Sequence, residues 1–200
     1  FHKSMVWLLA AGLLALFASG CSVRKYAVNK LGDALAKSGS GFASDDDPDL
    51  IKDAAPFSLK LIESLLTESP EHKGMLAAAN SGFTQYAYAF VQQDADEMEA
   101  KDLAASQQLR ARAKRLFLRA RNYGLRGLAV KRAGFEAALR QDPKSAVARC
   151  DKADVPLLYW TAAAWASVIS LSKDNPETIA DLPVVEALID RALALDEAYG

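Results

Sequence analysis

The sequence is poor in the residues that carry most protein chemistry. It contains two cysteines and two histidines among 200 residues. Two cysteines are too few for a disulfide scaffold, and two histidines leave little room for a zinc site or a histidine-based catalytic triad. Charge of one sign is also lacking, because 24 basic and 25 acidic residues give a net charge of −1. The whole-chain charge therefore offers no basis for attraction to nucleic acid or to an anionic membrane surface.

Motifs of catalysis and nucleotide binding are absent as well. The chain contains no G-x-x-x-x-G-K-[ST], no G-x-G-x-x-G, no H-E-x-x-H and no C-x-x-C. Carboxylates are plentiful, but no motif pairs them for acid–base work. With His72 as its only potential partner in the body of the chain, Cys150 is interpreted as a structural thiol. We therefore predict a protein that is not an enzyme and that holds no cofactor and no metal.

Glycine and proline are scarce, with 11 and 7 residues, whereas 38 alanines and 27 leucines make up a third of the chain. Alanine and leucine lose little side-chain freedom in a helix, so this composition favours helices over sandwiches, barrels and collagen-like chains. The predicted fold class is all-α.

The first twenty residues differ from the rest. A basic start precedes an apolar run over residues 5–18, which is too short to span a bilayer, and Ser19-Gly20-Cys21 follows. Small residues followed at once by cysteine resemble the lipobox of bacterial lipoproteins. That resemblance implies that residues 1–20 are a signal peptide and that Cys21 carries a lipid, and Ser22 after it implies the outer membrane. An uncut anchor or a plain secretory signal is the alternative.

Beyond Cys21 the chain divides into a tether and a helical body. Residues 21–48 combine a modest helical pattern with a Gly-Ser stretch and an acidic run, which predicts a flexible tether. Residues 49–200 form the predicted helical domain. It ends in what looks like the opening of a further helical unit, so we expect the domain to be truncated at its C-terminus.

Helix signals recur along this body. Five residues spaced by three or four predict one apolar stripe: Leu50, Ala54, Phe57, Leu61 and Leu65. A capping residue followed by proline, at positions 69–70, 142–143 and 175–176, predicts three helix starts. Three segments that end in a polar or acidic turn, residues 65–70, 138–143 and 192–196, resemble the closing part of tetratricopeptide repeats, although their spacing is irregular. That resemblance implies degenerate antiparallel helix pairs stacked in a compact superhelical array; an unrelated helical bundle is the alternative.

Two segments gather large rings beside alanines, at residues 82–90 and 157–166. At about 100° per residue the rings of the first segment spread around a helix, which is then buried on every side or lines a cavity. Core packing is one interpretation of both segments. The other is an apolar ligand cavity or pore with polar handles, lined by Phe83, Tyr86, Phe90, Tyr159, Trp160 and Trp165.

A third segment, residues 103–135, contains nine basic residues and no acid. Arg112, Arg115 and Arg119 share one helical face, and Arg126 continues it. A solvated face that pairs partly with the acidic run upstream is one interpretation. The other is a surface for a partner protein or an anionic ligand, because arginine binds carboxylates through two parallel bonds. Nucleic acid is not a predicted partner, because aromatic residues are not interleaved with these bases.

The lipobox, the turn at residues 65–70, the aromatic run at 82–90, and the segments 113–125 and 159–165 together resemble the T component of TRAP transporters. That resemblance implies a periplasm-facing, lipid-anchored helical protein that forms a homotrimer around a central pore. It also implies a TRAP-type periplasmic solute-binding protein as partner in the uptake of a hydrophobic or carboxylate ligand. A general scaffold for cell-envelope assembly, without a ligand cavity, is the alternative.

Overall fold

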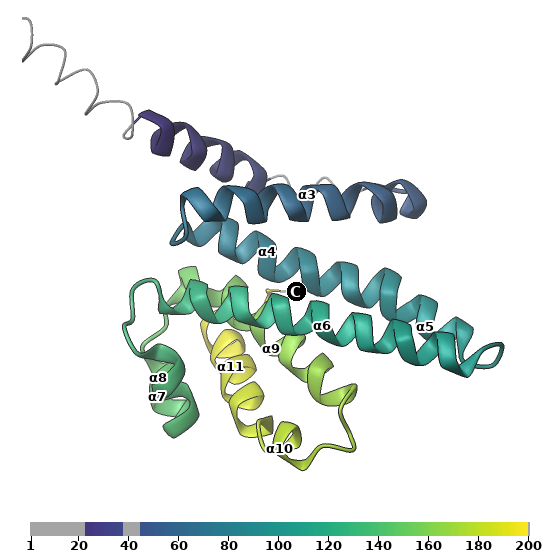
Figure 1. Ribbon diagram of the computed structural model, residues 1–200. Helices are drawn as coiled ribbons and strands as arrows, with labels where there is room; N and C mark the ends of the chain where they lie inside the picture. Colours follow the sequence, from purple (N-terminus) through teal and green to yellow (C-terminus); the bar gives the residue numbers. More distant parts are fainter. Residues whose placement is uncertain (1–22, 38–44, 200) are drawn as a thin grey trace, which may run out of the picture.

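The computed structural model describes residues 23–37 and 45–199, which contain helices and no strands. The all-α prediction is confirmed. A first helix covers residues 23–37. The helices that follow are α3 (Pro48–Glu68), α4 (Lys73–Tyr86), the π-helix η1 (Ala87–Gln92), α5 (Gln93–Met98), α6 (Leu103–Ala129), α7 (Phe135–Gln141), α8 (Pro143–Ala148), the 3-10 helix η2 (Lys152–Asp154), α9 (Val155–Ser170), α10 (Pro176–Ile179) and α11 (Leu182–Leu195) (Figure 1).

Helices that follow one another along the chain pack side by side. α4, η1 and α5 form one continuous rod, and α6 returns antiparallel to it (Figure 1). α9 then packs against both α6 and α4, and α11 packs against α9. The order in which these helices pack is compatible with stacked helix pairs, whereas the tetratricopeptide-like character of the pairs stays a prediction.

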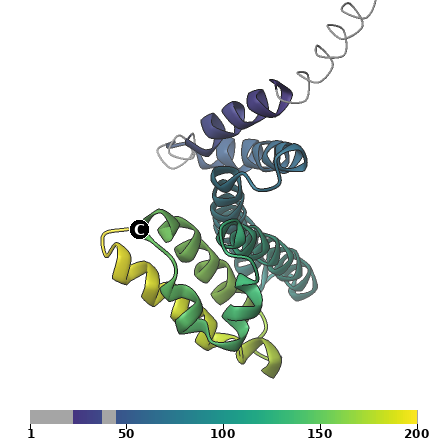
Figure 2. The ribbon, with the colours of Figure 1, turned by 90° about the vertical axis from the view of Figure 1, so that its left-hand side faces the viewer.

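The core has two parts, and α6 contributes to both. One part lies between α3, α4, η1 and α6, and includes Met75, Phe83 and Phe117. The other lies between the end of α6 and helices α7, α8, α9 and α11, and includes Trp165 and Leu188. In the view of Figure 2 the C-terminal helices stand to one side of the α4–α6 pair, and the helix of residues 23–37 lies at the far edge.

Two of the three predicted helix starts are confirmed. The side chain of Asp142 accepts a hydrogen bond from the amide of Ser145, and Pro143 opens α8. Asn175 caps α10 in the same way. The predicted start at residues 69–70 is wrong, because Ser69 ends α3 and α4 begins at Lys73. The cap there is His72, whose Nδ1 accepts from the amide of Met75.

The predicted apolar stripe of α3 is also wrong in register. Leu50 and Phe57 are exposed, the latter at 73%. The buried face consists of Leu59, Ile62 and Leu66. α3 contains enough apolar residues for two stripes, and spacing alone does not say which of them α4 covers.

Two buried polar contacts fix how the central helices meet. The amide of Asn80 in α4 is hydrogen-bonded to the hydroxyl of Thr161 in α9, at 3.1 Å. Asp154, fully buried before α9, forms ion pairs with Lys73 of α4 and Arg132 after α6. Buried charges must be paired, so these contacts specify which ends of the three helices meet.

The helix of residues 23–37 packs on the N-terminal end of α4. A Cβ atom added to Gly32 would lie 2.7 Å from the sulfur of Met75, so the two helices approach closely here. His72 Nε2 lies 3.2 Å from the carbonyl oxygen of Asn29 and 3.3 Å from the carboxylate of Asp33. This part of the predicted tether is therefore a helix in contact with the body.

Candidate functional site

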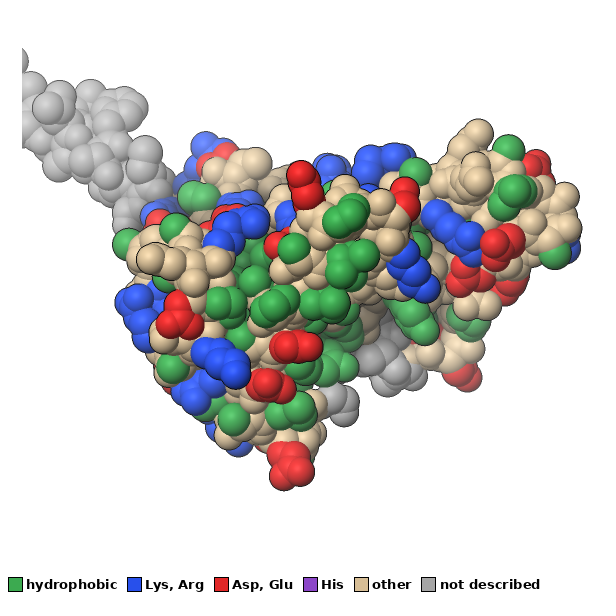
Figure 3. Space-filling model, turned by 90° about the horizontal axis from the view of Figure 1, so that it is seen from below, with side chains coloured by type: hydrophobic (Ala, Val, Ile, Leu, Met, Phe, Trp, Pro, Cys, Tyr) green, Lys and Arg blue, Asp and Glu red, His purple; other side chains and the backbone are tan. Residues whose placement is uncertain are grey.

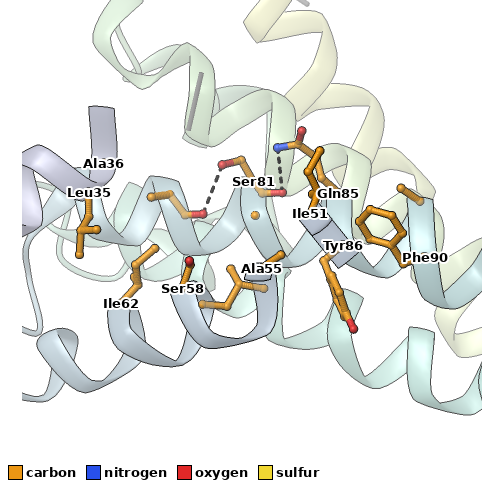
Figure 4. A pocket seen from close by; sticks show the side chains of 14 residues that line it. Leu35, Ala36, Ile51, Ala55, Ser58, Ile62, Ser81, Gln85, Tyr86 and Phe90 are labelled. Atoms are coloured by element: carbon orange, nitrogen blue, oxygen red, sulfur yellow. Dashed lines mark hydrogen bonds between the residues drawn. The ribbon is translucent and has the colours of Figure 1, made fainter. Parts of the chain in front are cut away.

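An apolar groove opens between the helix of residues 23–37, α3 and the rod formed by α4 and η1. Its volume is about 300 Å³. Figure 4 shows the side chains that line it converging from these elements. The lining residues are Leu35, Ala36, Ile51, Ala55, Ser58, Leu59, Ile62, Ala78, Ser81, Gly82, Gln85, Tyr86, Ala89 and Phe90.

The few polar side chains in the groove bond to their own helices. Ser58 donates to the carbonyl of Ala54 and Ser81 to that of Ala78, each at 3.3 Å. Gln85 donates to the carbonyl of Ser81 at 3.3 Å (Figure 4). Because these donors are occupied, the groove offers a ligand a surface that is apolar along most of its length.

One end of the groove is cationic. Tyr86 and Phe90 meet there with ring centroids 5.6 Å apart. Arg112 of α6 donates to the Tyr86 hydroxyl at 3.5 Å and lies 6.0 Å from the centre of its ring. Lys52 is close enough to interact electrostatically with Tyr86, and its hydrogen bond to Asp94 raises the pKa of Lys52. Lys52 is paired with the carboxylate of Asp94 at 2.8 Å, whereas Arg112 has no acidic partner among the described residues.

The π-helix η1 brings Ala89 and Phe90 to the side of the rod on which Tyr86, the last residue of α4, lines the groove. Gln93 donates its backbone amide to the carbonyl of Tyr88, five residues back, as a π-helix requires. The wider turn changes the angles between the rings, and Tyr88 points outward with 65% of its surface exposed. The interpretation of this segment as a helix buried on every side is therefore wrong. π-helical turns are frequent at functional sites.

The predicted lining residue Phe83 lies on another side of the rod. It is buried and stacks on Tyr123 of α6, with centroids 6.0 Å apart and planes 12° from parallel. Arg119 also lies over the Phe83 ring, with its guanidinium carbon 5.4 Å from the centroid. Phe83 thus joins α4 to α6 and does not line the groove.

The three aromatic residues predicted from the second segment lie in the C-terminal half. Trp165 is fully buried, and its indole nitrogen donates to Asp181 at 3.0 Å. Tyr159 and Trp160 are half-buried and meet edge to face at 5.1 Å. None of the three lines the groove. The structure therefore brings Tyr86 and Phe90 together and separates them from the C-terminal rings.

The four arginines of the predicted basic surface also lie at two separate places in the structure. Arg112 belongs to the end of the groove, whereas Arg115, Arg119 and Arg126 border a shallow hollow on α6 with Leu118, Asn122 and Tyr123. Arg119 lies 3.5 Å from Glu63, and Arg126 donates to the carbonyl of Pro70. Within residues 23–37 and 45–199, Arg115 forms no hydrogen bond or ion pair.

Glu63 is the carboxylate beside this hollow. It accepts a hydrogen bond from the hydroxyl of Tyr123 at 2.7 Å, and burial together with this bond raises the pKa of Tyr123 to about 12. One acid against three arginines leaves the hollow with an excess of positive charge. Arg110, by contrast, pairs with Asp96 and Glu99 of the acidic run, as the solvated-face interpretation predicts.

The side of the molecule that faces away from the helix of residues 23–37 has a surface of mixed charge and polarity. Seen from below, where α7, α8, α10 and α11 lie in Figure 1, hydrophobic, basic and acidic side chains are interspersed (Figure 3). No single sign prevails on that face, so it offers no continuous basic track of the kind that binds nucleic acid.

Sequence reasoning missed several groove residues. Leu35 lies in the predicted tether, and Ile51 and Ile62 lie outside the predicted apolar stripe. Lys52, which lies near the Tyr86 end of the groove, has no sequence feature that distinguishes it from other surface lysines. The alternation of two apolar stripes along residues 50–66 was the available signal, since a helix with two such stripes contacts more than one neighbour.

Cys150 is the one cysteine within residues 23–37 and 45–199. Cys150 is buried, and burial raises the pKa of its thiol. No group of three or more histidine, cysteine or acidic side chains within residues 23–37 and 45–199 could hold a metal ion. Among the same residues, no helix is both long enough and apolar enough to cross a bilayer. Cys21 and the predicted signal peptide lie outside the described residues.

The described residues form an all-helical fold with an apolar groove between the helix of residues 23–37, α3 and the α4–η1 rod. The family model for the TRAP transporter T-component matches residues 44–200. The chain belongs to this family, which is one of transporter components and not of enzymes. It is also 27% identical over 216 aligned positions to an uncharacterized protein of Treponema pallidum (strain Nichols), covering 99% of this chain and 67% of that protein.

Proposed function

We propose that this chain is a lipid-anchored, periplasm-facing component of a TRAP transporter that holds a ligand in the groove and works with a solute-binding protein in its uptake. Membership of the T-component family supports the link to transport. The observation that carries the proposal is the groove itself: an apolar surface that ends at the hydroxyl of Tyr86, with Arg112 and Lys52 beside it.

The groove is complementary to an amphiphile with a carboxylate at one end. Its volume of about 300 Å³ is at the lower limit of small-molecule sites. Aliphatic side chains such as Ile51 and Ile62 accept a hydrocarbon body by burial of apolar surface. A carboxylate at the Tyr86 end accepts hydrogen bonds from the phenol and from the Arg112 guanidinium. A saturated acid of moderate length is therefore the ligand class that we propose.

Equilibrium binding of octanoate, measured by calorimetry on the full chain, tests this proposal. The variant Ala89→Phe places a ring in the groove from an exposed position, so it blocks the site with little cost to folding. Ala104→Phe, also exposed but at the start of α6, is the matched control. We expect octanoate to bind the parent chain and Ala104→Phe equally, and Ala89→Phe more than tenfold less well. Equal binding by both variants would rule out the groove as the site.

The assembly belongs to the same proposal. We propose a homotrimer around a central pore, anchored through a lipid on Cys21, with the outer membrane as its location. Tyr159 and Trp160 are half-buried and are available to line such a pore, whereas Trp165 is enclosed within one protomer. The basic hollow of Arg115, Arg119 and Arg126 is the surface that we propose for the acidic side chains of the solute-binding protein.

A general scaffold for envelope assembly is the second candidate, and the same basic hollow supports it. The double variant Arg115→Glu/Arg119→Glu distinguishes the two functions. Loss of protein partners together with unchanged and specific octanoate binding is expected for the transport component. Loss of partners in a chain that binds no octanoate at all would favour the scaffold.

A further inference from the structure

The helix of residues 23–37 has one face on the body and one face without a partner among the described residues. Val28, Gly32 and Leu35, spaced by four and three, turn toward the body. The opposite face is exposed along its whole length. It consists of Val23, Tyr26, Ala27, Lys30, Leu31, Ala34 and Lys37.

This outer face is more apolar than solvent exposure explains. Val23, Tyr26 and Leu31 are 65%, 64% and 48% exposed. They lie on one face of a helix of 15 residues, which is about 22 Å long. Isolated apolar residues on a surface need no explanation, whereas a stripe of them along one helix marks an interaction surface.

The charges of the helix identify its partner. It contains four basic residues and one acid. The acid, Asp33, lies at the edge of the stripe beside His72 and Lys30, and Arg24 pairs with Glu68 of α3. Lys30 and Lys37 remain on the outer face, and Lys30 lies 5.7 Å from the centre of the Tyr26 ring. Apolar side chains between lysines, with a tyrosine at their edge, are the composition of helices that lie in the surface of an anionic bilayer.

We propose that the helix of residues 23–37 binds in the plane of an anionic lipid surface, with Val23, Tyr26 and Leu31 among the acyl chains and Lys30 and Lys37 among the phosphates. The helix lies at one edge of the molecule in both ribbon views, so a bilayer can approach it without meeting α9 or α11 (Figures 1 and 2). Its inner face contributes Leu35 and Ala36 to the groove. The groove then opens next to the membrane. The inference is independent of the ligand and of the transport partner.

A label that reports contact with lipid tests this inference even if the chain is also anchored by an acyl group. The full chain carrying Ala27→Cys is labelled with bimane and reconstituted in vesicles of phosphatidylglycerol and phosphatidylethanolamine that contain brominated acyl chains. The parent chain, with Cys21 and Cys150, provides the background, and Ala104→Cys on α6 is the matched exposed control. We expect strong quenching of the label at position 27 and none at position 104.

Charge and apolar variants in the labelled chain separate the two parts of the surface. Lys30→Glu/Lys37→Glu is expected to reduce quenching at position 27 by about tenfold or more, since each lysine near an anionic surface contributes about fivefold in partitioning. Lys101→Glu, which lies between α5 and α6, is the control for charge. Leu31→Ser is expected to reduce quenching, and Leu103→Ser, at another exposed leucine, is not.

Three results would overturn the inference. The first is a vesicle-bound chain whose label at position 27 is not quenched. The second is equal quenching in vesicles of phosphatidylcholine with no effect of the lysine variants. The third is exchange broadening between spin labels at position 27 of two chains, which requires direct contact of the two helices and would make a second copy the partner of this face. Octanoate binding, measured separately, stays informative about the proposed function in each case.

Discussion

The hydroxyl of Tyr86 lies 3.5 Å from the guanidinium of Arg112, where the apolar groove ends. The two residues come from different helices, since Tyr86 ends α4 and Arg112 lies in the middle of α6. In the sequence, Tyr86 was identified as part of an aromatic run and Arg112 as part of a basic face, but their contact was not predicted. Their contact gives an otherwise apolar groove one polar end, and it accounts for the ligand class that we propose.

Replacing Arg112 should weaken binding of an acid without weakening binding of the matching alcohol. An exposed charge contributes about 1 kcal/mol, so Arg112→Gln should lower the affinity for octanoate about fivefold. Octanol, which has no charge to pair, should bind the variant and the parent chain alike. Calorimetric titration with both compounds measures this difference. Arg115→Gln, at an exposed arginine outside the groove, is the control. An equal loss for octanoate and octanol would show that Arg112 supports the groove and not the carboxylate.

The contact between α4, α6 and α9 should tolerate no side chain at Gly124. A Cβ atom there would lie 1.9 Å from Thr161 Oγ1 and 2.6 Å from Asn80 Nδ2. Overpacking of this kind destabilises by about 3 kcal/mol. Gly134→Ala is a useful comparison, because nothing lies near its Cβ position and its φ of 72° costs about 1 kcal/mol for alanine. Urea unfolding of both variants gives the two values. A smaller loss for Gly124→Ala than for Gly134→Ala would contradict the described packing.

Because of Asp154, the free energy of unfolding should depend on pH when the pH is below 3.8, the ordinary pKa of this carboxyl. Burial alone would raise the pKa of Asp154, but hydrogen bonds from Lys73, the Asp151 amide and Arg132 outweigh burial and lower it from 3.8. Because the pKa of Asp154 is lower in the folded state, its ionised carboxylate stabilises the fold fully above pH 3.8. This stabilisation is lost as the pH falls through the folded-state pKa.

The variant Asp154→Asn isolates this contribution. It leaves two cations without their buried counter-charge and should cost about 3 kcal/mol at neutral pH. The difference from the parent chain should be smaller at a pH below 3.8 than at neutral pH, because the unfolded parent then binds a proton that the folded Asp154 does not. Urea unfolding at both pH values measures it, with the exposed Asp174→Asn as control. A difference that is the same at the two pH values would show that the pairs do not stabilise the fold through charge.

Trp165 should matter for stability and not for the groove. It is fully buried, bonds to Asp181, and lies under the guanidinium of Arg121 at 4.7 Å. Trp165→Ala should cost about 3 to 5 kcal/mol in unfolding free energy. Trp165→Phe, which retains most of the volume, keeps the experiment possible if the alanine variant does not fold. Octanoate affinity of the folded protein should stay unchanged in either variant. A loss of affinity in folded protein would connect the C-terminal rings to the ligand.

Helix content and two helix starts followed from the sequence because they depend on local chemistry. Alanine and leucine favour helix at any position, and Asp142 and Asn175 cap through bonds to residues three positions on. The predicted start of α4 was wrong because the capping residue is His72, an uncommon residue in this position, and not Ser69. The predicted apolar stripe of α3 was wrong because this helix has two apolar faces, and only the packing of α4 decides which of them is buried.

The site could be predicted only in part, for a related reason. Tyr86 and Phe90 stood out as aromatic residues, and Arg112 as part of a basic face. Their meeting depends on the π-helical turn at Ala87–Gln92 and on how α6 lies against α4, neither of which a residue pattern specifies. Phe83 and Trp165 are also large rings in alanine-rich segments, as Tyr86 is, but they are packed in the core. A large ring beside alanines indicates close packing, and tertiary structure decides whether a cavity remains.

The mass of the full-length, detergent-extracted protein under native conditions tests the central claim most directly. It should be measured alone and then with a TRAP-type solute-binding protein from the same cell. A homotrimer that takes up this partner, and that releases it when Arg115 and Arg119 are changed to glutamate, is the result we expect. A monomer whose mass does not change on addition of the partner would contradict the account.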